Sequence, residues 1–246
     1  MLLEFTDTKY VCPVLYKCGY STLGYVYFYK KAGRLLKKYE DTDDAIMQYY
    51  NPRTIDLYND YKVFFVWRDP YERLVSLYKD TASGSMHHAG LVKEMGYPRK
   101  ELLNDIGLFV QAALDVARAK RDNHVKKQAD VLRDEHITLD RVDVIVDIKD
   151  LQPFIYNDLQ FTEAKVMRNI SRKDIDVSGF EEYRQQIVSF YQEDYDIRTN
   201  YSQKFYIPQA YTEPKSMDPR SVVGADYLFE DKLYKIYKRI KHKFCR

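Results

Sequence analysis

The chain has 246 residues, of which 45% are hydrophobic and 31% charged, which suits a folded domain with a sizeable core rather than a disordered segment. Its 39 basic and 37 acidic residues leave a net charge of +2, so polyanion binding over the whole chain is excluded and no nucleic-acid partner is expected. The apolar runs are too short to cross a bilayer. Residues 1–7 have no basic region followed by an apolar stretch, so we expect no secretory signal and a cytoplasmic protein. The three cysteines lack metal-ligand spacing, so we expect neither a disulfide framework nor a zinc site.

Hydrophobic patterning predicts strands and helices that alternate along the chain. The first predicted strand covers residues 9–16, and after a turn a helix follows over Thr22–Tyr39. A second strand is expected over Tyr61–Trp67, whose last five residues are an unbroken apolar run, and Pro70 fits the first turn of a helix over Tyr71–Thr81. The later predicted elements are a helix over Lys100–Lys120, a strand over Val142–Ile148 and helices over Leu151–Leu159 and Gly179–Tyr191. This order favours an α/β fold with a central, mainly parallel sheet flanked by helices.

The first candidate site is the turn between the first predicted strand and its helix. A tight turn that opens a helix presents unpaired backbone N–H groups to an anion, and the helix dipole adds partial positive charge. The residues that offer such groups are Lys17, Cys18, Gly19, Tyr20, Ser21 and Thr22. The pattern is not a Walker A loop, because the lysine precedes the hydroxyl residues. The alternative is an ordinary strand-to-helix turn in which Thr22 caps the helix.

The second candidate site follows the second predicted strand. Arg68 lies where that strand ends, which is the usual ligand edge of an open α/β sheet. Ser76 lies eight residues later on the next helix, and Arg73 lies one helical turn before it. An arginine with a nearby hydroxyl suits a terminal phosphate dianion. In the alternative interpretation Arg68 pairs with Asp69 or Glu72, Arg73 pairs elsewhere, and Ser76 is a small packing residue.

Together the two loops resemble the 5′-phosphosulfate loop and the 3′-phosphate motif of the Golgi-type carbohydrate sulfotransferases (family 2-like), which use 3′-phosphoadenosine-5′-phosphosulfate (PAPS). The stretch Val66–Tyr78 is similar to that family's R-x-P-x-x-R-L-V-S-x-Y element. The first loop matches less closely, with Tyr16 in place of a proline and Tyr20 in place of a small residue. Weaker matches follow at Asn123–Gln128, Val142–Leu151 and Asp194–Tyr201.

The resemblance implies a P-loop-like three-layer fold and a PAPS-dependent sulfotransferase domain over residues 1–201. Such an enzyme moves a sulfuryl group from PAPS to an acceptor hydroxyl, here of a carbohydrate or glycoconjugate. It releases adenosine 3′,5′-bisphosphate (PAP) as the product and uses no metal. Lys17 and the N–H groups of its loop would neutralise the leaving phosphate. Arg68 and Ser76 would bind the 3′-phosphate, which distinguishes this donor from ATP.

The acceptor hydroxyl also needs a general base, and histidine is the usual choice. His124 matches the family's H-x-x-x-Q segment and ranks first. If this stretch is helical, Gln128 lies one turn away and its amide would orient the ring. His87 and His88 rank second, on a loop that follows the helix predicted over Tyr71–Thr81. An aspartate or glutamate base stays open.

Residues 202–246 form a C-terminal extension, in which Leu228–Arg246 has the pattern of a basic amphipathic helix. This helix either packs on the domain with a solvated basic face or meets an anionic membrane surface or an acidic glycan.

Two other functions stay open at this point. One is a nucleotide-dependent kinase or NTPase, against which the missing Walker A loop argues, and the other is a non-catalytic protein that binds anionic glycans or membranes.

Overall fold

The computed structural model describes residues 1–36, 42–83, 89–163 and 175–212. The chain divides into two compact units. The first comprises Met1–Tyr20, Pro52–Leu151 and Ile170–Pro208, and the second comprises Ser21–Asn51, Gln152–Asn169 and Gln209–Arg246. The predicted boundary at residue 201 stays a prediction, and the predicted basic helix over Leu228–Arg246 lies outside the described residues.

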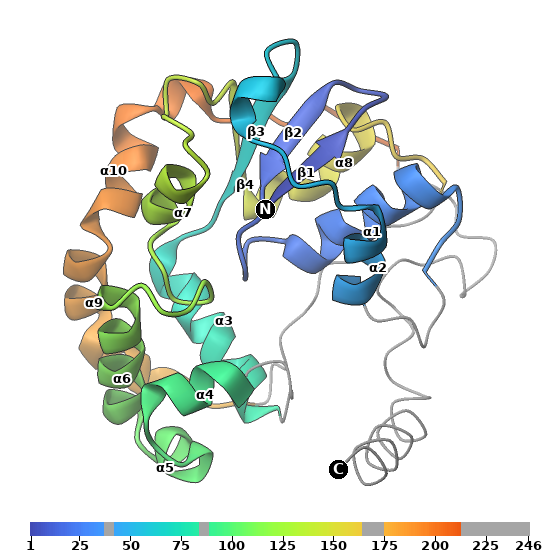
Figure 1. The fold of residues 1–246 in the computed structure, drawn as a ribbon. Helices are drawn as coiled ribbons and strands as arrows, with labels where there is room; N and C mark the ends of the chain where they lie inside the picture. Colours follow the sequence, from blue (N-terminus) through green and yellow to red (C-terminus); the bar gives the residue numbers. More distant parts are fainter. Residues whose placement is uncertain (37–41, 84–88, 164–174, 213–246) are drawn as a thin grey trace, which may run out of the picture. The chain divides into compact units, whose positions relative to one another are not determined.

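The first unit contains a four-stranded sheet in the order β1-β2-β3-β4 (Figure 1). Strand β1 (Leu2–Phe5) pairs antiparallel with β2 (Tyr10–Pro13), whereas β3 (Lys62–Trp67) runs parallel to β2, and β4 (Val144–Asp147) runs parallel to β3. The three predicted strands are confirmed with shorter bounds, and β1 is an addition. The chain therefore has an α/β fold with a mostly parallel sheet, and the last five residues of β3 are all buried, as their apolar run predicts.

Helix α3 (Pro70–Ala82) confirms the helix expected after β3. The Asp69 carboxylate accepts a hydrogen bond from the Glu72 backbone N–H at 3.0 Å, and Pro70 lies in the first turn, so both start signals act as expected. The single helix predicted over Lys100–Lys120 is wrong, because the structure has two helices there, α5 (Arg99–Asn104) and α6 (Ile106–Arg118). They separate at Asp105, whose backbone is extended and whose carboxylate caps α6 through the Leu108 N–H at 2.9 Å.

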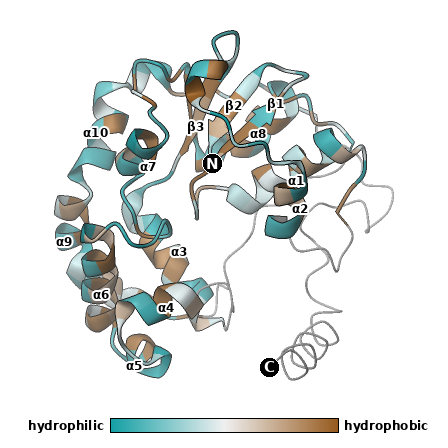
Figure 2. Cartoon of the chain, in the orientation of Figure 1, coloured by the Kyte–Doolittle hydropathy of each residue, from teal (hydrophilic) through white to brown (hydrophobic). Residues whose placement is uncertain are grey.

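The other α-helices of this unit are α4 (Ala89–Met95), α7 (Gln128–Asp134), α9 (Arg184–Phe190) and α10 (Gln192–Asn200). The helix predicted over Gly179–Tyr191 is divided between a 3₁₀ helix, Ser178–Tyr183, and α9. Figure 2 shows hydrophobic residues along β3 and both polar and apolar residues on α6.

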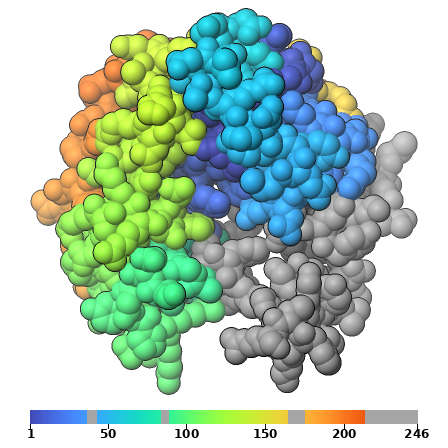
Figure 3. Space-filling model, in the orientation of Figure 1, coloured from blue at the N-terminus to red at the C-terminus, as the bar shows by residue number. Residues whose placement is uncertain are grey.

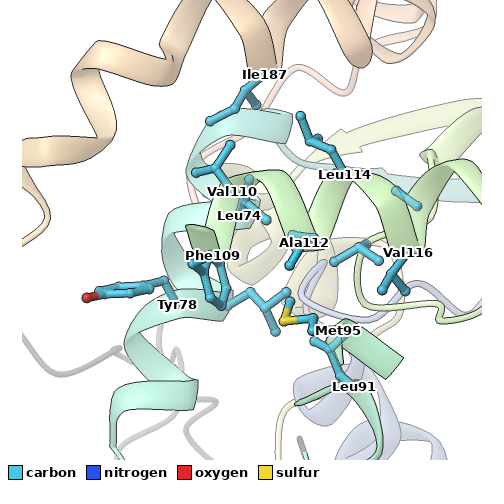
Figure 4. Packing of buried hydrophobic residues seen from close by; sticks show 14 of the residues in the cluster. Leu74, Tyr78, Leu91, Met95, Phe109, Val110, Ala112, Leu114, Val116 and Ile187 are labelled. Atoms are coloured by element: carbon cyan, nitrogen blue, oxygen red, sulfur yellow. The ribbon is translucent and has the colours of Figure 1, made fainter. Parts of the chain in front are cut away.

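A hydrophobic cluster joins α3 to α6 and α9 (Figure 4). Leu74 and Tyr78 of α3 pack with Phe109 of α6 and Ile187 of α9, and the rings of Tyr78 and Phe109 meet edge to face with centroids 5.0 Å apart. In the space-filling view α4, α5 and α6 form a closely packed green surface (Figure 3). This cluster fixes the position of α3, on which the second candidate motif lies.

The described α-helices of the second unit are α1 (Tyr20–Ala32), α2 (Thr42–Tyr49) and α8 (Leu151–Asn157), whose first residues Tyr20 and Leu151 fall in the first unit. Helix α1 confirms the predicted helix but ends seven residues earlier than Tyr39, since Gly33 takes a left-handed conformation (φ 67°) and its N–H bonds to the carbonyl of Tyr29. Among the residues that the structure describes, no helix has the length and apolar character to cross a membrane.

Candidate functional site

The two predicted loops follow neighbouring parallel strands, β2 and β3, and so meet at the carboxyl edge of the sheet. They are joined directly, because Nη1 of Arg68 donates a hydrogen bond to the backbone carbonyl of Lys17 at 2.8 Å. The loop expected to hold the 5′-phosphosulfate thus contacts the arginine expected to bind the 3′-phosphate.

The loop after β2 has a tight backbone. Lys17 (φ 66°) and Gly19 (φ 79°) are both left-handed. A Cβ atom on Gly19 would lie 2.4 Å from Cδ2 of Leu151, and the left-handed conformation would cost any other residue roughly 1–2 kcal/mol. Position 19 therefore favours glycine, because a Cβ atom would displace the end of the Leu151 side chain and the left-handed backbone suits glycine best.

The Lys17 ammonium forms an ion pair with the carboxylate of Asp80, near the end of α3. Only 12% of the Lys17 side chain is exposed. Burial lowers the pKa of Lys17, and the carboxylate of Asp80 acts in the opposite direction. Asp80 was not predicted as a site residue, although it lies four residues after Ser76 and hence on the same face of the helix.

The guanidinium of Arg73 is buried and bonds to backbone carbonyls. Its Nε donates to Tyr16 at 3.2 Å, Nη1 donates to Lys126 at 2.7 Å, and Nη2 donates to Asn123 at 2.9 Å. Arg73 therefore joins the loop after β2 to the segment before α7, in agreement with the interpretation in which it pairs elsewhere.

The buried side chain of Gln128 fixes the backbone of Arg68. Its Oε1 accepts from the Arg68 N–H at 3.0 Å, and its Nε2 donates to the Arg68 carbonyl at 2.7 Å. The thiol of Cys18 also donates to Oε1, at 3.5 Å. The prediction that Gln128 orients the ring of His124 is wrong, because α7 begins only at Gln128 and the amide bonds to Arg68 and Cys18.

Several other predicted donor residues are buried. Cys18 has almost no exposed surface, and burial raises the pKa of its thiol, which keeps it protonated. The ring of Tyr20 packs on that of Tyr16 with centroids 5.0 Å apart, and Ser76 is buried on α3. Ser21 and Thr22 lie in the first turn of α1 and belong to the second unit, so their part in the site stays a prediction.

The ring of His124 lies close to a carboxylate that sequence analysis missed. Nδ1 of His124 is 2.7 Å from Oδ1 of Asp122, and the ring packs on Tyr16 with centroids 4.5 Å apart. The only sequence signal for this pair is the D-x-H spacing. The second-ranked candidates, His87 and His88, lie outside the described residues.

A buried carboxylate, that of Asp194, holds the start of α7 in place. Asp194 accepts hydrogen bonds at 2.9 Å from the backbone N–H groups of Gln128 and Ala129, the first two residues of α7, and its own carbonyl accepts from Trp67 Nε1 at 3.0 Å. Asp194 thus caps the helix whose first residue fixes Arg68.

Asp194→Ala should lower the free energy of unfolding by about 2–4 kcal/mol, because two buried N–H groups lose their acceptor. Asp194→Asn keeps one carbonyl oxygen and should lose less. Urea unfolding monitored by circular dichroism measures both values. An Ala variant that loses under about 0.5 kcal/mol, as surface substitutions do, would contradict the capping role.

Within the described part of the chain no three or more His, Cys, Asp or Glu side chains are grouped as metal ligands. Comparison of the chain with models of protein families, with curated proteins and with solved structures gives no match.

Proposed function

We propose that the protein is a PAPS-dependent sulfotransferase that transfers a sulfuryl group to a hydroxyl of a carbohydrate or glycoconjugate and releases PAP. The P-loop-like three-layer architecture belongs to the same proposal. The observation that supports it most directly is the hydrogen bond from Arg68 Nη1 to the Lys17 carbonyl, because it brings together the two loops on which the family resemblance depends.

The charges around these loops favour an anionic ligand. Arg68 and Arg73 both lie close enough to Lys17 to lower its pKa, and Asp80 is the carboxylate that opposes them there. Three cations near one another repel when they are partly removed from water. A bound phosphate or sulfate group would offset this repulsion, which a neutral ligand could not do.

The donor set of Arg68 fits such a ligand. Its Nε is buried and has no hydrogen-bond partner among the described residues, and leaving a buried donor unpaired is costly. A phosphate group can accept two parallel hydrogen bonds from one guanidinium, each through its own oxygen. In the proposed complex Arg68 and Ser76 hold the 3′-phosphate, while Lys17 and the backbone around Gly19 hold the 5′-phosphosulfate.

PAPS, when bound, would supply an activated sulfuryl group. Lys17 would then stabilise the negative charge that grows on the leaving oxygen, as a preorganised donor does. His124 would accept the proton of the acceptor hydroxyl.

The donor site can be tested by thermal unfolding with nucleotides. PAP should raise the Tm of the wild type through ligand linkage, whereas adenosine 5′-phosphate and ADP should raise it little. Arg68→Ala should remove most of the PAP shift. Arg118→Ala, which removes an exposed arginine at the end of α6, is the matched control and should keep it.

Equal Tm shifts with PAP and adenosine 5′-phosphate would contradict a 3′-phosphate site. A larger shift with ADP than with PAP would favour a kinase or NTPase instead. Mass spectrometry of a glycan panel incubated with PAPS and the protein then identifies the acceptor by the gain of one sulfate.

A further inference from the structure

We propose that Asp122 is a positioning residue that holds His124 in the Nδ1–H tautomer, so that Nε2 presents a lone pair to the acceptor hydroxyl. The catalytic part of this inference rests on the proposed function, whereas the tautomer can be measured without it. Both residues lie in the segment between α6 and α7.

Asp122 contacts His124 at two atoms. Its Oδ1 lies 2.7 Å from the ring Nδ1 of His124. The same oxygen accepts a hydrogen bond from the backbone N–H of His124, also at 2.7 Å. Only 15% of the His124 side chain and 18% of the Asp122 side chain are exposed, so the interaction is partly shielded from water. An ionised carboxylate only accepts hydrogen bonds, so in the neutral imidazole the ring proton must be on Nδ1, and the lone pair is then on Nε2.

The segment that contains this pair is held on both sides. Val125 and Lys126 donate backbone hydrogen bonds to the carbonyl of Asp122 at 3.3 and 3.0 Å, which closes a turn around His124. Arg73 bonds to the carbonyls of Asn123 and Lys126. The position of the Asp122–His124 pair is thus fixed by its own turn and by a buried guanidinium.

The same guanidinium connects the pair to the Lys17 loop. Nε of Arg73 donates to the carbonyl of Tyr16, the residue directly before Lys17. The ring of Tyr16 also packs on the imidazole of His124, with an angle of 37° between the rings. The family resemblance leads one to expect a proline at position 16, so this departure from the pattern has a structural explanation: Tyr16 supports the ring of His124.

The proposed step is balanced in atoms and charge. As the acceptor oxygen forms its bond to sulfur, its proton passes to Nε2 of His124. The bond between sulfur and the donor phosphate oxygen breaks, and its electron pair leaves with that phosphate. The imidazolium formed is stabilised by the Asp122 carboxylate at Nδ1, and its proton is then lost to water.

The tautomer is measured by two-bond ¹H–¹⁵N NMR correlation on ¹⁵N-labelled full-length protein, with the His124 signals assigned from the His124→Gln variant. The wild type should show a protonated Nδ1 and an unprotonated Nε2 wherever His124 is neutral. Asp122→Asn places an amide that can donate to Nδ1, so the population should shift toward the Nε2–H tautomer. Asp115→Asn, an exposed aspartate on α6, is the matched control and should change nothing.

Kinetics with PAPS and the acceptor supply the second measurement. Asp122→Asn should lower kcat by about 10²-fold with little change in the KM for PAPS, and Asp122→Glu should recover part of the loss. Because Asp122 acts through His124, the double variant Asp122→Asn/His124→Gln should be no slower than His124→Gln alone. The Glu variant also keeps the test usable should the Asn variant not fold.

An unchanged tautomer in Asp122→Asn, or independent kinetic losses that multiply in the double variant, would overturn the inference. A tautomer that shifts as expected in a protein that transfers no sulfuryl group would support the orientation by Asp122 and contradict the proposed function. The two failures are therefore distinguishable.

Discussion

Lys17→Ala should lower kcat by about 10²-fold or more and weaken donor binding less, since a preorganised charge acts most strongly where negative charge develops in the transition state. Folding stability should fall as well, because only 12% of the Lys17 side chain is exposed and removing one partner of a largely buried pair is destabilising. Steady-state kinetics with PAPS and PAP-dependent thermal shifts separate the effect on turnover from the effect on binding.

The partner of Lys17 makes a sharper test possible. Removing Lys17 alone takes away the ammonium that neutralises the Asp80 carboxylate beside the proposed phosphosulfate, and this carboxylate would then repel the donor. In the double variant Lys17→Ala/Asp80→Ala this repulsion is absent. If the lysine stabilises the transition state, the double variant stays slow even where it binds PAP normally. Recovery of near-normal turnover in the double variant would instead show that Lys17 only neutralises Asp80.

The sequence predicted the three parallel strands β2, β3 and β4 but not β1 (Leu2–Phe5), because the parallel strands have a strong local signal. The apolar run that ends at Trp67 and the alternating residues of β4 both predict buried strands, and the capping residues Asp69 and Pro70 mark the start of α3. Helix α5 and helix α6 were predicted as one because their apolar periodicity continues on both sides of Asp105. Only the extended backbone there, with the cap that it allows, separates them.

The candidate site was predicted in part. Lys17 and Arg68 are local features, since each follows a strand, and the parallel pairing of β2 with β3 brings them to one edge. Asp80 was missed because its partner, Lys17, lies 63 positions away. Asp122 contacts His124 only two residues away, but the D-x-H spacing alone does not predict that contact. The turn that contains Asp122 is fixed by a buried arginine 50 positions from Asn123.

For Arg73 and Gln128 the motif alone does not tell whether the side chain contacts a ligand or the protein backbone. Both lie in segments that resemble sulfotransferase motifs. Gln128 was expected to orient the ring of His124, and Arg73 was expected either to help bind a phosphate or to pair elsewhere. In the structure both side chains instead hold backbone segments in place. Arg73 donates to three backbone carbonyls, and Gln128 bonds to the backbone N–H and carbonyl of Arg68. Their side chains therefore position the loops on which Lys17, Arg68 and His124 lie.

His124→Ala should lower kcat by about 10²–10⁴-fold, the usual effect of losing a general base, and should leave the PAP-induced Tm shift intact. The reason is positional: the Asp122 carboxylate orients the imidazole, and Tyr16, directly before Lys17, packs on it. His136 provides a matched control, because it is exposed and left-handed (φ 57°), a conformation that asparagine accepts. His136→Asn should keep both kcat and the Tm shift.

Two results would assign His124 differently. A His124→Ala variant with normal turnover would exclude it as the base and direct attention to His87, His88 or a carboxylate. Loss of the PAP-induced Tm shift together with turnover would place His124 in the donor site or in the support of the Lys17 loop, since its ring packs on Tyr16. His124→Gln separates these last two cases, because it keeps most of the side-chain volume against Tyr16 and cannot accept the proton as imidazole does. Recovery of the Tm shift in the Gln variant, with turnover still low, would show that the ring both supports the loop and takes the proton.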